Sequence, residues 1–237
     1  MAYVFMFLVL SLLILIHEMG HLIGAKLVRI PVSQFSIGFG PKLWGVSVGG
    51  TQYRLSAIPL GGYVLPETAD PAEFNRLPLR ARVLFSLAGP MGNLLAAFLV
   101  SSATAIASTG FSFHSAVAVP LAELWNMSLQ VLGSIPLLLH QPDRLSGVVG
   151  IVASGGRYAG TNVERILHLS ILLNVNLAIF NLLPLPPLDG GKVLMCAMEK
   201  VFKPLRRMEI PLAVAGWVLL LGLMAYATVL DIHRIAA

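Results

Sequence analysis

The motif His-Glu-Met-Gly-His at residues 17–21 lies inside an apolar run that extends from about Val4 to Leu27. The motif holds the only charged or histidine side chains of that run before its last turn, and burying such groups in hydrocarbon costs several kcal/mol unless they are compensated. Positions i and i+4 share one face of a helix, so His17 and His21 can both ligate one zinc ion. Glu18 then lies beside the metal as a possible general base. The alternative, a chance HExxH motif on a soluble helix, does not explain the apolar surroundings.

Composition indicates a membrane protein. Hydrophobic residues make up 57% of the 237 residues and charged residues 11%, against roughly 25% charged residues in soluble domains. The formal net charge of +5 does not indicate nucleic-acid binding, because the basic residues lie in loops between apolar segments rather than in a patch with aromatics. The single cysteine, Cys196, excludes an internal disulfide and a cysteine-cluster metal site.

Four segments are apolar and long enough to cross a bilayer, which requires about 20 residues each. They are predicted at about 4–27, 83–108, 166–188 and 210–230. The stretch 119–139 carries Glu123, Asn126, Gln130 and Pro136, which favours an amphipathic or partly inserted helix over a fifth full span. The N-terminal run is interpreted as a retained helix rather than a signal peptide, because it lacks a basic start and a cleavage site. We therefore predict an all-α polytopic membrane protein forming a single domain over residues 1–237.

A glycine-rich region at 32–64 interrupts the helical pattern. Short apolar pieces at Trp44–Val48 and Thr51–Leu55 flank Gly49-Gly50, a pattern typical of a β-hairpin. Its apolar character predicts a small membrane-associated sheet. Backbone at that depth must be paired or line a cavity.

The distribution of Lys and Arg predicts the orientation. The segments after the first and third spans hold most of the basic residues, whereas the longer connection between the second and third spans holds only Arg144, Arg157 and Arg165. The two basic segments are therefore expected to face the cytoplasm, with both termini facing outward and the site toward the cytoplasmic side.

The third zinc ligand is sought among acids and histidines at a suitable depth. Most candidates fall in loops or at the outer ends of spans: Glu67, Asp70, Glu73, His140, Asp143, His168, Glu199, Glu209 and His233. Asp189 remains, directly after a proline-rich stretch that breaks the third span. An aspartate before two glycines can also simply form a turn at the end of a membrane helix. The incomplete ligand set of the HExxH motif favours the ligand interpretation.

The motifs together resemble the site-2 protease family of intramembrane zinc metalloproteases. The resemblance rests on HEMGH in the first span and NLLPLPPLDGG at the end of the third. It is supported by GPMGN in the second span and by the FGP and PLGGY segments between them. It implies Zn²⁺ bound by His17, His21 and Asp189 and an acid/base role for Glu18. It also implies that Asn181 positions substrate or stabilises the oxyanion, although Asn181 could instead bond backbone freed by the prolines.

The resemblance further implies an enzyme of the bacterial inner membrane that cleaves transmembrane helices of protein substrates. Such cleavage serves regulated intramembrane proteolysis or removes signal-peptide remnants. Asn93 is interpreted as a structural residue that hydrogen-bonds between helices. Residues 109–117 leave no room for the PDZ domain that sigma-regulating bacterial members carry after the second span, so the regulatory mode of those members is not expected. An edge of the Trp44–Leu55 hairpin is expected to hold the unwound substrate as an added strand.

Three alternatives stay open. The chain could be a membrane zinc-binding or transport protein without hydrolysis, although Glu18 adds a base that transport does not require. It could be a membrane-anchored protease acting on cytosolic loops with Glu199 as third ligand. It could also be an inactive scaffold that binds membrane helices. The sequence does not identify the substrate or predict an oligomeric state.

Overall fold

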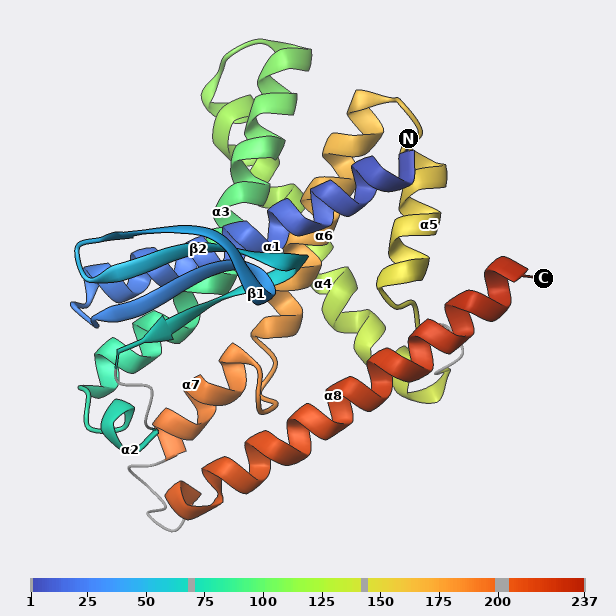
Figure 1. The fold of residues 1–237 in the computed structure, drawn as a ribbon. Helices are drawn as coiled ribbons and strands as arrows, with labels where there is room; N and C mark the ends of the chain where they lie inside the picture. The colour runs from blue at the N-terminus through green and yellow to red at the C-terminus, as the bar shows by residue number, and fades with distance from the viewer. Residues whose placement is uncertain (1, 68–70, 142–144, 199–204, 237) are drawn as a thin grey trace. The chain divides into compact units, whose positions relative to one another are not determined.

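The structure, a computed structural model, describes residues 2–67, 71–141, 145–198 and 205–236 (Figure 1). Most of these residues are helical. The elements in chain order are α1 (Ala2–Leu27), β1 (Val32–Val48), β2 (Thr51–Pro66), α2 (Pro71–Phe74), α3 (Leu79–Thr109), the π-helix η1 (His114–Ala118), α4 (Val119–His140), α5 (Val148–Ala159), α6 (Val163–Asn181), α7 (Asp189–Met198) and α8 (Leu205–Ala236).

Four of the described helices are long and apolar enough to cross a membrane, which confirms the predicted number of spans. They cover Tyr3–Leu27, Leu79–Thr109, Val163–Asn181 and Ile210–Ile235. The prediction that the third span continues to residue 188 was wrong. Helix α6 ends at Asn181 because three prolines follow within six residues, and each removes a backbone donor and clashes with the preceding turn. Segment 119–139 forms the predicted helix, α4, and its partial insertion stays a prediction.

Contacts divide the chain into two compact units. One consists of Met1–Leu10, Leu94–Ile179 and Pro211–Ala237, and the other of Ser11–Asn93 and Phe180–Ile210. The second unit contains the HExxH motif, the sheet and the LDGG segment, and we call it the motif unit. The first, which we call the helical unit, contains α4 and α5 complete. That residues 1–237 act as a single protease domain stays a prediction.

The sheet of the motif unit is larger than the predicted hairpin. The turn at Gly49-Gly50 is present, with positive φ at both glycines, and Val48 pairs with Thr51. Strands β1 and β2 are both long, however, and they bend so that residues 34–37 have partners on two sides, at 52–55 and at 62–65. Thr51–Leu55 is therefore an internal segment of the sheet. The outer segments are 42–48 and 62–66. The Trp44–Val48 strand of the predicted hairpin is therefore an edge, and its capture of a substrate stays a prediction.

Within the motif unit, α1 and α3 approach closely through small residues. A Cβ added to Gly20 would lie 2.3 Å from the carbonyl oxygen of Ala88, and one added to Gly24 would lie 2.4 Å from the Cβ of Ala88. Helix interfaces in membranes favour such small residues because they let backbones come together. This approach brings the histidine face of α1 against the Gly89–Asn93 turn of α3.

A small hydrophobic cluster lies at the end of α1 in the same unit. Its buried members are Ala25, Ile30, Val32 and Phe85. It joins the end of α1, the start of β1 and the first half of α3. Removing a side chain such as Ile30, Val32 or Phe85 from water contributes about 1.5–3 kcal/mol, so the cluster helps to fix the relative positions of the elements that carry the site.

The helical unit is held in part by a buried carboxylate. Asp231 of α8 is 1% exposed and accepts hydrogen bonds from the backbone N–H groups of Gly147 and Gly150 at 2.8 and 2.7 Å. It thereby satisfies donors at the start of α5, which otherwise have no helical partner. Helix α5 itself was not predicted from the sequence.

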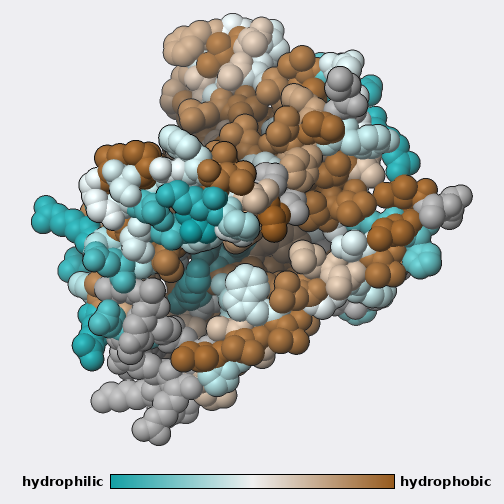
Figure 2. Space-filling model, viewed as in Figure 1, coloured by the Kyte–Doolittle hydropathy of each residue, from teal (hydrophilic) through white to brown (hydrophobic). Residues whose placement is uncertain are grey.

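Large hydrophobic side chains are exposed along the spanning helices. Leu8, Leu99 and Trp217 are examples, each more than half exposed. Figure 2 shows brown, hydrophobic atoms along α8 and teal, hydrophilic atoms near the strands. Exposing this much apolar surface to water would be unfavourable. The same surface is suited to contact with the lipid chains of a membrane.

Candidate metal centre

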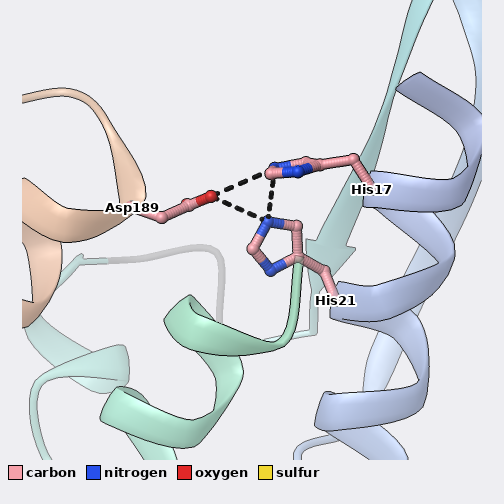
Figure 3. Close-up of side chains that lie close together, drawn as sticks. All are labelled: His17, His21 and Asp189. Carbon is pink, nitrogen blue, oxygen red and sulfur yellow. Dashed lines mark hydrogen bonds and ion pairs between the residues drawn. The ribbon is translucent and has the colours of Figure 1, made fainter. Parts of the chain in front are cut away.

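The structure brings together the three predicted ligands from two distant parts of the motif unit. His17 and His21 project from one face of α1, and Asp189 projects toward them from the first turn of α7 (Figure 3). All three are buried, with 7%, 6% and 4% of each residue exposed. The arrangement is a group of three side chains whose ligand atoms could hold one metal ion.

The distances within this triad suit a tetrahedral ion. Oδ2 of Asp189 lies 3.1 Å from Nε2 of His17 and 3.1 Å from Nε2 of His21. The two Nε2 atoms are 3.2 Å apart. Zinc bonds of about 2.0–2.1 Å in tetrahedral geometry separate neighbouring ligand atoms by about 3.3 Å. Three edges of nearly that length define one face of such a tetrahedron.

The other nitrogen of each imidazole contacts an acceptor on α3. Nδ1 of His17 lies 2.8 Å from Oδ1 of Asn93, and Nδ1 of His21 lies 2.8 Å from the backbone carbonyl oxygen of Phe85. The orientation of the Asn93 amide is set by its Nδ2, which donates to the carbonyl oxygen of Leu13 at 3.1 Å. Each Nδ1 must therefore carry the proton and donate it. A metal-binding histidine usually donates its second N–H in this way.

With the protons on Nδ1, the two Nε2 lone pairs and a carboxylate oxygen of Asp189 point at one another. Three electron-rich atoms within about 3 Å repel one another in a buried site, where charges are poorly screened. A cation between them removes the repulsion. Burial acts to raise the pKa of the Asp189 carboxyl, but its contacts with His17, His21 and Lys192 hold that pKa below its ordinary value.

Gly89 of α3 lets the two histidine rings pack directly against its backbone. A Cβ at this position would lie 2.3 Å from Nε2 of His21 and 2.8 Å from Nε2 of His17. Any larger residue would thus displace the two nitrogens that could ligate an ion. The donor set fits zinc, which accepts histidine nitrogen and carboxylate oxygen.

Asp189 is positioned by the close packing of the two glycines that follow it. A Cβ on Gly190 would lie 2.1 Å from the carbonyl oxygen of Leu182, and one on Gly191 would lie 2.5 Å from that of Leu185. The first turn of α7 therefore rests directly on the backbone of the loop after α6. Asp189 both begins a helix and faces the histidines, so the turn and ligand interpretations of the sequence are compatible.

Glu18 lies next to the triad and to the sheet. It follows His17 on α1, is half-buried, and its Cγ would lie 3.2 Å from a Cβ at Gly62 of β2. Glu18 is therefore adjacent both to His17 of the triad and to Gly62 of β2. Proximity to the reacting proton is the first requirement for a general base.

The other predicted residues are placed as follows. Asn181 is the last residue of α6 and is half-buried, and its role in substrate binding stays a prediction. Asn93 makes the predicted bond between helices, to Leu13, but also contacts a ligand histidine, which the sequence analysis missed. Glu199, the alternative third ligand, lies outside the described residues.

One signal in the sequence could have revealed the wall of the site on α3. Phe85, Gly89 and Asn93 are spaced by four residues, so they share one helix face. Phe85 supplies a carbonyl acceptor, Gly89 allows the histidine rings to approach closely, and Asn93 supplies an amide acceptor. The backbone carbonyl of Phe85 carries no signature in sequence, but the Gly89–Asn93 pair does.

Comparison of the sequence with known proteins identifies the family of the chain. The model of Peptidase family M50 matches residues 5–223. A protein of Clostridium perfringens named "Putative zinc metalloprotease" is 27% identical over 332 positions, covering 97% of this chain and 98% of the relative. One of the same description from Campylobacter jejuni is 25% identical over 340 positions, covering 96% and 92%. Both alignments are longer than this chain, so these relatives contain internal segments that it lacks.

A shorter match is more similar. A Thermotoga maritima protein with the same printed name is 39% identical over 110 positions, covering 42% of this chain and 22% of the relative. The chain belongs to Peptidase family M50, the site-2 protease family. It is a zinc metalloprotease and an integral membrane protein, which confirms the class and cofactor predicted from HEMGH and LDGG.

Proposed function

We propose that His17, His21 and Asp189 hold the zinc of this metalloprotease and that Glu18 is its catalytic acid/base. The observation that carries the assignment is the convergence of two Nε2 atoms and one carboxylate oxygen within 3.1–3.2 Å, with both Nδ1 protons committed to acceptors on α3. Glu18 lies beside this group, adjacent in sequence to one ligand.

The chemistry follows from these positions. Zinc held by His17, His21 and Asp189 would lower the pKa of the attacking water toward about 7. Glu18 accepts a proton from the attacking water as its oxygen adds to the scissile carbonyl carbon. The same carboxyl then gives the proton to the leaving amide nitrogen as the C–N bond breaks. Asn181 is assigned to donate a hydrogen bond to the developing oxyanion or to position the substrate.

The substrate is assigned as a transmembrane helix of another protein, which must unwind before a peptide bond reaches Glu18. The segment 62–66 supports this assignment. Residues 62–65 pair with β1 on one side, and Gly62 adjoins the side chain of Glu18. An unwound segment added to the other side would have its backbone donors and acceptors paired and would pass close to the base. We assign the capture to outer segment 62–66 rather than to the Trp44–Val48 edge, because Gly62 adjoins Glu18.

The location is assigned from charge. Basic residues concentrate after the first and third spans, and such segments stay in the cytoplasm. We assign the protein to the bacterial inner membrane, with both termini outward and the metal site toward the cytoplasmic side.

The test is cleavage of a reporter transmembrane helix by the purified protein in liposomes, with products identified by mass spectrometry. Glu18→Gln should retain zinc and lose cleavage. Glu73→Gln, an exposed glutamate of α2, is the matched control and should cleave normally. Full activity of Glu18→Gln would refute the acid/base role. Zinc flux into vesicles that accompanies absent cleavage in the wild type would instead favour the transport alternative.

A further inference from the structure

We infer that Lys192 is a positioning residue for the metal site, and that it restricts the Asp189 carboxylate to offering a single oxygen to the metal. The inference rests on the zinc assignment proposed above and extends it to a residue that the HExxH and LDG motifs leave without a role. It starts from the two oxygens of Asp189, which have different partners.

Oδ2 of Asp189 faces both histidines, at 3.1 Å from each Nε2. Oδ1 points the other way and accepts a hydrogen bond from Nζ of Lys192 at 3.0 Å. Among the described residues, Lys192 is the cation in contact with that oxygen. The two oxygens of Asp189 therefore have different partners: Oδ2 faces the histidines and Oδ1 accepts a hydrogen bond from Lys192.

Helix stability does not account for a lysine at this place. Lys192 lies in the first turns of α7, which begins at Asp189, and a cation near the N-terminus of a helix opposes the helix dipole. The side chain is 50% exposed, and an ion pair with such an exposed partner contributes little to folding stability. Its contact with a buried ligand oxygen is the feature that distinguishes it from an ordinary surface lysine.

The consequence concerns coordination. A carboxylate with both oxygens free can bind a metal through two atoms and occupy two positions. Donation from Lys192 to Oδ1 leaves Oδ2 as the ligand atom and keeps a position open for water, as a catalytic zinc site requires. Partners of this kind, one step removed from the metal, typically change metal affinity or activity 10–100-fold when they are removed.

The experiment compares Lys192→Met and Lys192→Arg with the wild type by two measurements on the purified protein. The first is zinc affinity by competition with a chelator. The second is the visible absorption of the Co²⁺-substituted protein, which depends on the number and arrangement of ligand atoms. Lys26→Met is the matched control, because Lys26 is an exposed lysine of the motif unit whose Nζ donates to Tyr53 Oη.

We expect Lys192→Met to bind zinc roughly 10–100-fold more weakly and to weaken and shift the Co²⁺ bands. We expect Lys192→Arg to restore both, and Lys26→Met to change neither. If Lys192→Met does not fold, Lys192→Leu is measured in its place with the same expectations, because leucine also lacks a donor.

Unchanged affinity and an unchanged Co²⁺ spectrum in the folded Met or Leu variant would overturn the inference. Failure of arginine to restore a changed spectrum would overturn it too, because arginine offers a donor of the same charge. Asp189→Ala separates this inference from the site itself. Zinc retained in that variant would refute the ligand assignment, whereas zinc lost there with no effect at Lys192 would refute only the role of the lysine.

Discussion

Oδ1 of Asn93 lies 2.8 Å from Nδ1 of His17, so an amide from the second spanning helix holds a proposed metal ligand of the first. The same amide donates from Nδ2 to the carbonyl oxygen of Leu13, one turn before the histidine. Asn93 is 0% exposed, and the two bonds fix its orientation. It thereby fixes both the rotation of the His17 ring and the nitrogen that is free to bind metal.

Removing this contact should weaken metal binding without abolishing the fold. Asn93→Ala is expected to reduce zinc affinity roughly 10–100-fold, the usual effect of losing a hydrogen-bond partner of a metal ligand. Asn93→Asp keeps an acceptor for Nδ1 and should bind zinc more tightly than Asn93→Ala. Chelator competition measures both. Asn174→Ala, at a buried asparagine of the helical unit, is the control, and equal affinities for it and Asn93→Ala would contradict the assigned role.

Gly89 provides a second test, by steric exclusion. Gly89→Ala should lose zinc, since the added Cβ would lie 2.3 Å from Nε2 of His21. Gly222→Ala is the matched control, because no atom lies within 4 Å of a Cβ at that position of α8. The control should keep its metal and gain up to about 1 kcal/mol of helix stability. The measurement is the zinc content of the two purified variants. Stoichiometric zinc in Gly89→Ala would place the ion elsewhere.

Variants of Asn181 distinguish an effect on metal binding from an effect on the transition state of the reaction. Asn181→Ala should retain zinc but lower kcat by about 10²-fold, as loss of one oxyanion donor does. Asn181→Ser is the conservative variant and should recover part of the loss. Steady-state cleavage of the reporter helix gives kcat and KM. A rise in KM alone would assign Asn181 to substrate binding, and normal kinetics would leave it as a structural residue at the end of α6.

Asp231 tests the helical unit independently of catalysis. Asp231→Ala removes the acceptor of the Gly147 and Gly150 N–H groups, and each unsatisfied buried donor costs about 1–3 kcal/mol. We expect a lower melting temperature in detergent and faster amide exchange at the start of α5, with zinc content unchanged. Asp231→Asn retains an acceptor and should fall between the alanine variant and the wild type. Unaltered exchange at Gly147 in the alanine variant would contradict the proposed contact.

The sequence predicted the parts of the molecule that depend on local pattern. The four spans follow from hydropathy, and the turn at Gly49-Gly50 follows from residues that tolerate positive φ. Asp189 emerged by elimination, because few titratable residues lie at membrane depth. The spans and the turn can be predicted from the residues near them in the sequence. Asp189 can be predicted by comparing the positions of all titratable residues in the chain.

The remaining features depend on tertiary contacts. The contact of Asn93 with His17 was missed because a buried asparagine in a helix is equally consistent with any helix-to-helix bond. The carbonyl of Phe85 is backbone and has no signature. The second half of β2 was missed because residues 56–66 carry glycines and prolines and show no clear alternation, yet they pair with β1 through an irregular register.

The central claim is that Asp189 forms one zinc site with two histidines 172 and 168 positions before it in the chain. Metal content tests this claim most directly. Wild-type protein, Asp189→Ala and Glu18→Gln are purified in parallel, each with its folding checked. We predict about one zinc per chain in the wild type and in Glu18→Gln, and none in Asp189→Ala. Zinc retained by a folded Asp189→Ala would contradict the account and direct the search for the third ligand to another residue.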